Sequence, residues 1–120
     1  MKDGQHNLRH FDYLDHMAEA ISMACSYVEG LDKADFMTDK RTQQAVILNL
    51  IVIGETATQI AVEYPEFAAA HPAVPWKKMR GMRNRMAHGY FEIDLEVVWD
   101  TVQQSLPDLA LRIADIQAQE

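Results

Sequence analysis

The residues that could do chemistry are gathered in one stretch, Lys77 to Tyr90, which reads KKMRGMRNRMAHGY. It contains five of the eleven Lys and Arg residues, and no Asp or Glu occurs between Phe67 and Phe91. The whole chain has a formal net charge of -7, so the rest of it is strongly acidic. We expect a small, focused site for an anion such as phosphate in this stretch. Broad coating by nucleic acid, which needs many phosphate contacts, is disfavoured.

At about 100° per residue, this stretch is predicted to form a helix with two faces. The polar face consists of Lys77, Gly81, Asn84 and His88. The opposite face, predicted to be core, consists of Met79, Met82 and Met86. Gly81 leaves room for a ligand or a second backbone to come close. Gly89 is a C-terminal cap that leaves His88 in the last turn, where the helix dipole favours a protonated imidazole. Such a group suits a proton donor or a phosphate contact.

Two further charged residues fit the same site. Arg83 lies about 140° around the helix from His88, so both reach one anion only if the long Arg side chain wraps around. Glu55 follows Gly54 in the most apolar predicted helix, where an unpaired carboxylate would be costly. Arg83 is its expected partner, an arrangement that would hold the guanidinium in place for phosphate. The alternative, equally supported, places Glu55 at a solvated helix edge.

The run RNRMAHGY, from Arg83 to Tyr90, resembles the R-x4-H-x-Y motif of the HEPN superfamily, in particular that of the HepT toxins. Other landmarks are similar to that family in order and spacing: Gly54-Glu55, Pro75-Trp76, and the segment from Ile93 to Trp99 followed by Leu106-Pro107. The resemblance covers nearly the whole chain. Gly89 departs from the pattern, because relatives often have a polar or acidic residue there.

This resemblance implies a ribonuclease toxin that needs no metal or cofactor. An RNA 2′-hydroxyl attacks the adjacent phosphate, His88 moves a proton, and Arg83 offsets the charge on the phosphate oxygens. Asn84 would orient His88 or the scissile phosphate. RNA phosphates would be bound by Lys77, Arg80 and Arg85.

The resemblance also implies partners. One His cannot easily be both base and acid at one bond, so a homodimer with two facing motifs is expected. The antitoxin would be a minimal nucleotidyltransferase of the MntA type, and Tyr90 matches the tyrosine to which it attaches AMP. A second hypothesis is a HEPN domain without nuclease activity that presents nucleotide or substrate to such an enzyme. A third, a structural dimer without a ligand, leaves the acid-free basic segment unexplained.

Composition limits the remaining possibilities. At 120 residues and 48% hydrophobic, the chain is predicted to be one domain, residues 1–120. Its longest apolar run, Ala45 to Ile53, is far short of the ~20 residues that span a bilayer, and no apolar signal region opens the sequence. We therefore expect a soluble, cytoplasmic protein without a membrane partner. The single cysteine, Cys25, excludes an internal disulfide and is expected to be buried.

The remaining histidines and the tryptophans have simple interpretations. His6 and His10 could hold a metal at i, i+4 spacing, but no Cys or carboxylate completes a ligand set. We expect both to be solvent-exposed, as we do His16, and His71 to lie in a loop. Trp76 and Trp99 could stack on bases, but their positions favour core packing.

Helical periodicity predicts an all-α antiparallel bundle of four long helices plus short pieces. The long helices cover about residues 8–29, 38–62 and 75–88 and a region that begins at Asp94. The middle of the second is apolar all round, which favours burial in the core on one side and a subunit contact on the other. Residues 31–39 are expected to be a loop and residues 66–70 a short helical turn. Ser105 and Pro107 are expected to end one helix and start the last.

Overall fold

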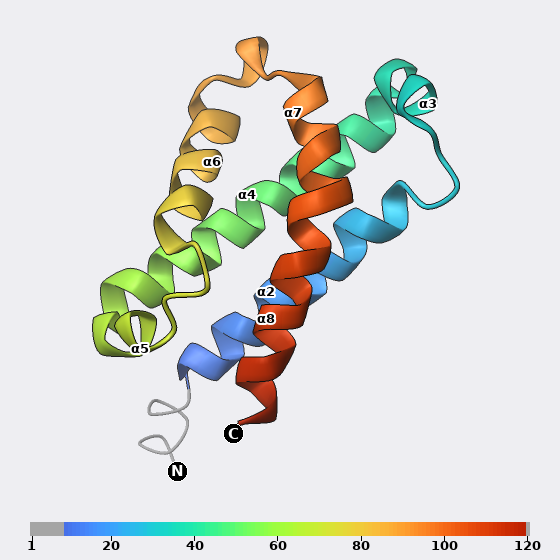
Figure 1. Cartoon of the computed structure of the whole chain (residues 1–120). Coiled ribbons are helices and arrows are strands. Elements are labelled where there is room, and N and C mark those ends of the chain that lie inside the picture. Colours follow the sequence, from blue (N-terminus) through green and yellow to red (C-terminus); the bar gives the residue numbers. More distant parts are fainter. Residues whose placement is uncertain (1–8, 120) are drawn as a thin grey trace.

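Helix α4 (Lys40–Glu63) is the element on which the others are assembled. In the computed structural model, which describes residues 9–119, α2 packs along one side of α4 and α6 along another (Figure 1). The other elements are α2 (Arg9–Tyr27), α3 (Lys33–Thr38), α5 (Pro65–Ala70), α6 (Trp76–His88), the 3-10 turn η1 (Tyr90–Glu92), α7 (Leu95–Asp100), the π turn η2 (Thr101–Ser105) and α8 (Leu106–Ala118). No strand occurs within residues 9–119, which confirms the predicted all-α class.

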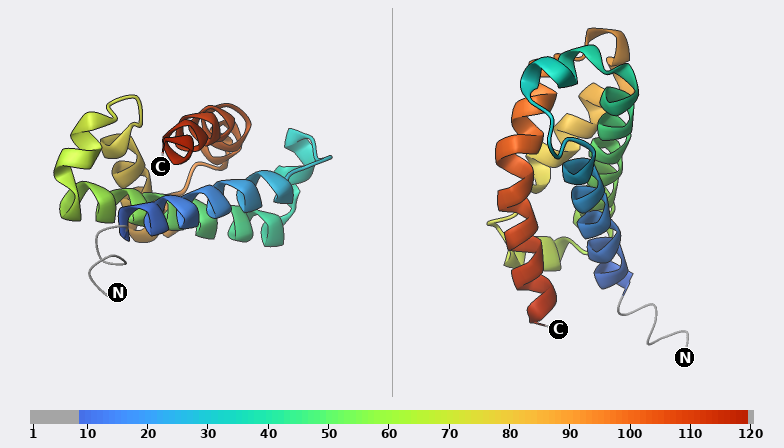
Figure 2. Two further views of the ribbon diagram at one scale, coloured as in Figure 1. Left: turned by 90° about the horizontal axis from the view of Figure 1, so that it is seen from below. Right: turned by 90° about the vertical axis from the view of Figure 1, so that its right-hand side faces the viewer.

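The core lies between two layers of helices. α2 and α4 run side by side, and the α7–η2–α8 unit covers one face of that pair (Figure 2). Side chains from all of these helices meet there and are fully buried, among them Leu14, Met17, Leu50, Ile53, Val98 and Ile113. α6 packs closely on α4, so its position depends mainly on that one helix.

α4 is long and apolar enough to cross a membrane by length and composition. Half of its most apolar window is nevertheless buried against the rest of the chain. This is the burial expected of a core helix in a soluble fold, where apolar positions face neighbouring helices on more than one side.

Residues 33–38, expected to lie in a loop, form helix α3 instead. Asp32 caps it, because its carboxylate accepts from the Asp35 N–H at 2.8 Å, and the Asp35 carboxylate accepts from the Asp32 N–H at 3.2 Å. These reciprocal bonds satisfy two backbone donors at the start of the helix. Phe36 is fully buried and anchors the short helix to the core. The prediction was wrong because the D-x-x-D capping pattern was overlooked.

The last helix starts where predicted, since α8 begins at Leu106 with Ser105 as its N-cap residue and Pro107 in its first turn. The interruption of the backbone expected at this point does not occur. α7 continues through the π turn into α8, and the Leu106 N–H donates to the Thr101 carbonyl, five residues back. Ser105 makes no capping hydrogen bond. A proline has no N–H and clashes with the carbonyl four residues before it, so a locally widened turn accommodates Pro107 without ending the helix. The buried positions continue across this point at spacings of three and four: Val98, Val102, Leu106, Leu109, Ile113 and Ile116.

The remaining helix ends are close to those predicted. α2 ends at Tyr27, and Gly30 follows with a φ of 79°. α4 begins at Lys40, because the Asp39 carboxylate accepts from the Thr42 N–H at 3.1 Å and from its hydroxyl at 2.7 Å. These bonds lower the pKa of Asp39. Cys25 is half-buried at the edge of the core instead of fully buried, and burial raises the pKa of its thiol.

Candidate active site

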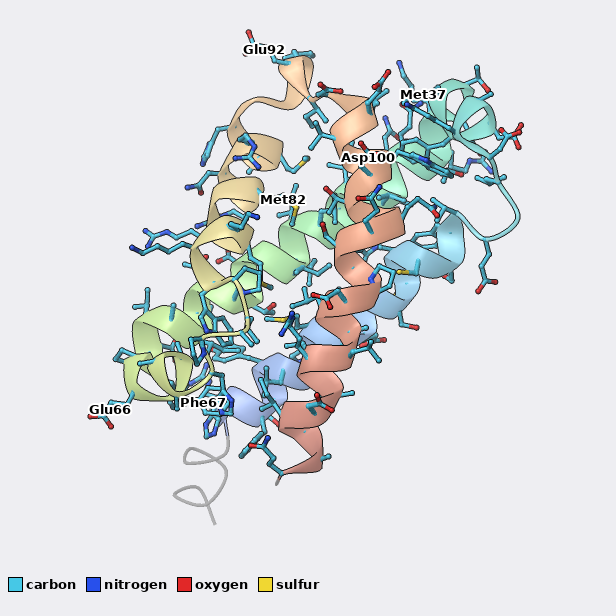
Figure 3. All side chains as sticks on the ribbon, viewed as in Figure 1. Met37, Glu66, Phe67, Met82, Glu92 and Asp100 are labelled. Atoms are coloured by element: carbon cyan, nitrogen blue, oxygen red, sulfur yellow. The ribbon has the colours of Figure 1, made fainter. Side chains whose placement is uncertain are left out.

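The start of α6 is fixed by a tryptophan. The Trp76 Nε1–H donates to the carbonyls of Ala68 at 3.0 Å and His71 at 3.1 Å, which joins α6 to the preceding α5. Pro75 is the N-cap of α6, so the helix begins at Trp76, one residue after the predicted start. From there the Met face lies on the core, with Met79 and Met86 buried and Met82 half-buried, as predicted. Figure 3 shows Met82 on the side of α6 that faces the α7–α8 unit.

α6 crosses α4 at Gly54, where the two backbones come very close. A Cβ at Gly54 would overlap the Cβ of Arg83 and lie 2.6 Å from the Met79 carbonyl oxygen. Only glycine fits such a crossing. The close backbone approach within the chain therefore occurs at Gly54 and not at Gly81, where a Cβ would meet only Arg85 Nη1 at 3.7 Å. Sequence reasoning treated Gly54 as a landmark and missed this role.

Next to this crossing, Arg83 and Glu55 form the predicted ion pair. Arg83 Nη1 donates to Glu55 Oε1 at 2.7 Å. The Arg83 side chain is 21% exposed and that of Glu55 is 49% exposed, so the pair lies at a solvated edge of the crossing. The Nε of Arg83 is buried and has no hydrogen-bond partner within the described residues. The guanidinium is thus directed by α4 on one side while part of its donor capacity stays unused.

The other predicted site residues lie on the open surface of α6. Asn84 and His88 are exposed, and the exposed cations are Lys77, Lys78, Arg80 and Arg85. His88 is the last residue of the helix, and the Gly89 N–H donates to the Arg85 carbonyl at 2.9 Å. Gly89 caps the helix as predicted, although with φ at -112° it does not adopt a left-handed conformation. Tyr90 begins η1, and its side chain lies outside the described part of the structure.

A hollow runs along α6 on the side that faces the α7–η2–α8 unit. Its floor is apolar and includes Ile53, Met79 and Leu106, while Lys78 and Arg85 lie at its rim. Sequence reasoning did not single out Lys78, and no local pattern could have done so, because its neighbours in the hollow come from two other helices. An anion could therefore bind on this side of α6, where two cations border an apolar surface.

No group of three or more His, Cys, Asp or Glu side chains within residues 9–119 could hold a metal ion. His6 lies outside the described residues. His10 packs between the rings of Phe11 at 4.2 Å and Phe67 at 4.5 Å, so its predicted solvent exposure is wrong. Contact with aromatic rings at the facing ends of α2 and α5 explains the difference. His16 is exposed, as predicted.

The remaining aromatic predictions are confirmed. His71 lies in the loop after α5, at its C-cap. Trp76 and Trp99 are half-buried and pack against the core, with the Trp99 ring 5.4 Å from that of Phe36.

Comparison with known proteins gives one consistent result. A family described as ribonuclease HepT-like matches residues 17–116. A protein from Thermococcus cleftensis, named as a probable ribonuclease HepT, is 40% identical over 83% of this chain and 88% of its own length. Two proteins named as candidate RNases are also similar. The protein from Caldanaerobacter subterraneus is 30% identical over 90% of this chain and 94% of its own length. The protein from Methanocaldococcus jannaschii is 34% identical over 88% of this chain and 82% of its own length. No solved structure gave a significant match.

Proposed function

The chain belongs to the HepT-like ribonuclease family, and on that premise we propose that it is a metal-independent endoribonuclease, the toxin of a toxin–antitoxin pair, acting in the cytoplasm. The observation that carries this proposal is the arrangement on α6. Arg83 is held by Glu55 at the α4 crossing, and the exposed His88 ends the same helix. The helix is rich in cations and has no acidic residue.

The proposed reaction is an internal transfer at phosphorus. The RNA 2′-hydroxyl attacks the adjacent phosphate, the bond to the 5′-oxygen breaks, and the products are a 2′,3′-cyclic phosphate and a 5′-hydroxyl. One proton leaves the attacking oxygen and one is delivered to the leaving oxygen. His88 carries out one of these transfers. Arg83 offsets the negative charge that grows on the phosphate oxygens, and Asn84 orients His88 or the phosphate.

We further propose that two copies of the chain share the reaction. A His88 from each copy would supply the base and the acid. The exposed Lys77, Arg80 and Arg85 would bind the RNA backbone on either side of the cut. The antitoxin would be a nucleotidyltransferase of the MntA type, which attaches AMP to Tyr90 and so places bulk and negative charge beside the motif.

The test uses purified protein, end-labelled RNA and a chelator. We expect cleavage to persist in EDTA and to yield a 2′,3′-cyclic phosphate, since the attacking oxygen belongs to the substrate. Activity that is lost in EDTA and restored by a divalent ion contradicts metal independence. A 3′-hydroxyl product contradicts attack by the 2′-hydroxyl.

The residue assignment is tested with matched variants. Arg83→Ala and His88→Ala should abolish cleavage and keep the fold, whereas Arg112→Ala on α8 and His16→Ala on α2 should cleave normally. His88→Gln should be no better than His88→Ala, because the amide keeps the size and loses the titratable proton. Undiminished cleavage by folded His88→Ala protein would remove the assignment. A wild-type protein that binds RNA or nucleotide without cleaving would support the non-catalytic HEPN alternative.

A further inference from the structure

Phe91 is the most exposed large apolar side chain in the described part of the chain. It is 98% exposed, compared with 69% for Leu111, the next highest. It lies in η1, directly after the motif, at the outer tip of the connection between α6 and α7, where Figure 3 shows the neighbouring Glu92. Phenylalanine gains most of its stabilising free energy from burial, so this position contributes little to the fold.

Phe91 also borders a hollow of mixed chemistry. The first turns of α4 supply Lys40, Gln44 and Ile47, and the start of α7 supplies Leu95. The hollow therefore combines apolar walls with an amide and a cation. A nucleobase has these requirements, because its face is apolar, its edge forms hydrogen bonds, and its phosphate is an anion.

The hollow is close to the reacting groups along the chain. Phe91 is three positions after His88, a span of at most about 11 Å, which is within reach of a nucleotide next to the cut. The exposed cations of α6, among them Arg80 and Arg85, precede His88 in the chain, whereas Phe91 follows it. An aromatic ring beside cations that track a phosphate backbone is a common arrangement for holding single-stranded nucleic acid.

We propose that Phe91 stacks on a nucleobase adjacent to the scissile phosphate, with Lys40 and Gln44 facing the same nucleotide. Phe91 is then a residue that holds the strand in place next to the cut, whichever base stands there. This inference rests on the proposed ribonuclease function. A protein partner is the less favoured occupant, because the charged and amide groups of the hollow do not suit a docking apolar side chain.

The test measures binding of a short fluorescein-labelled single-stranded RNA of mixed sequence to His88→Ala protein, which leaves the RNA intact. In that background, Phe91→Leu keeps an apolar side chain and removes the ring, whereas Phe91→Trp keeps a ring. We expect Phe91→Leu to weaken binding at least about fivefold and Phe91→Trp to stay within about twofold. Leu111→Ala, another exposed apolar position, should bind as the parent does.

A second arm locates the base. In this arm, each oligonucleotide of a series lacks the base at a different position. With the parent protein, which retains Phe91, affinity should fall when the base is missing at one position near the cut. With the Phe91→Leu protein, loss of the base at that position should not change affinity. Equal binding by the Phe91 and Phe91→Leu proteins would overturn the inference, as would a loss of binding that accompanies a change in oligomeric state. If the unaltered protein neither binds nor cleaves RNA, the proposed function fails instead.

Discussion

Arg83 reaches its position through contacts on two sides. Its Cβ lies against Gly54, and its Nη1 donates to Glu55, which is half exposed. Ion pairs with this degree of exposure contribute only about 0.2–1 kcal/mol to folding. The pair therefore matters more for the direction of the guanidinium than for stability. A group that must stabilise developing charge gains most when it is oriented before the substrate arrives.

Glu55→Gln tests this role at the residue scale. The amide keeps the shape and loses the charge, so Arg83 should be held less firmly and cleavage should fall about tenfold. The free energy of unfolding in urea should change by less than about 1 kcal/mol. Asp108→Asn is the matched control, since Asp108 accepts from Arg112 in a surface ion pair on α8 at 2.9 Å. Equal cleavage by the two variants would show that Glu55 does not position Arg83.

The residue contacts were only partly predictable. The Arg83–Glu55 pair could be expected, because a carboxylate in an apolar helix needs a cation and the acid-free segment supplies one. The environment of His10 could not be predicted, since its neighbour Phe67 lies far away in sequence and on another helix. For the same reason, the hollow at Phe91 became visible only when α4 and α7 were placed beside η1.

At the scale of elements, the position of α6 depends on its crossing with α4. Gly54→Ala should force the helices apart, because the added methyl group overlaps Arg83 and the Met79 carbonyl. We expect a loss of about 1–3 kcal/mol in unfolding free energy and a loss of cleavage.

Gly81→Ala is the control for this stability measurement. Its methyl group meets only Arg85 Nη1 at 3.7 Å, so replacing a helical glycine should raise stability by about 0.5–1 kcal/mol. Equal stabilities for Gly54→Ala and the parent protein would contradict the close crossing.

Periodicity predicted α2 and α6 because each has a regular apolar face, and the long stretch that is apolar all round predicted α4. It failed where a single residue was taken as a stop signal. α8 does begin at Leu106 with Pro107 in its first turn, but the interruption expected before it is absent, and the apolar spacing from Val98 to Ile116 continues. A wider turn at Thr101–Ser105 accommodates the proline, and this local adjustment leaves no mark in the periodicity. Burial of one continuous apolar face outweighed the local signal.

At the scale of the whole molecule, the proposed dimer has a quantitative consequence. One cut would then require His88 from both copies. When wild-type and His88→Ala proteins are mixed and allowed to exchange subunits, RNA cleavage should therefore be strongly inhibited. Activity should follow the square of the wild-type fraction, so an equal mixture retains about a quarter of it. A linear dependence, about half in the same mixture, would mean that each chain carries a complete site. Mixing with His16→Ala protein controls for exchange itself and should leave activity unchanged.

The proposed nucleotidyltransferase would act on the assembled dimer, so its effect is also predicted at this scale. Incubation with the cognate nucleotidyltransferase and ATP should add one or more AMP units at Tyr90 and suppress cleavage, because a charged group then competes with substrate phosphate. Tyr90→Phe protein should remain active and resist silencing. Mass spectrometry of digested protein locates the modification. AMP found at another residue, or a silenced Tyr90→Phe protein, would contradict the assignment.

The crossing at Gly54 also has a consequence for genetics. Every missense change in a glycine codon adds a Cβ, and at Gly54 any Cβ meets the backbone and Arg83 of the motif helix. If the chain is a toxin as proposed, a selection for cells that survive its expression without the proposed antitoxin should collect loss-of-function alleles at codon 54 as well as at codons 83 and 88. Almost any base change at the first two positions of codon 54 should inactivate the chain and so appear in surviving colonies. Few codons outside the motif should tolerate so few substitutions.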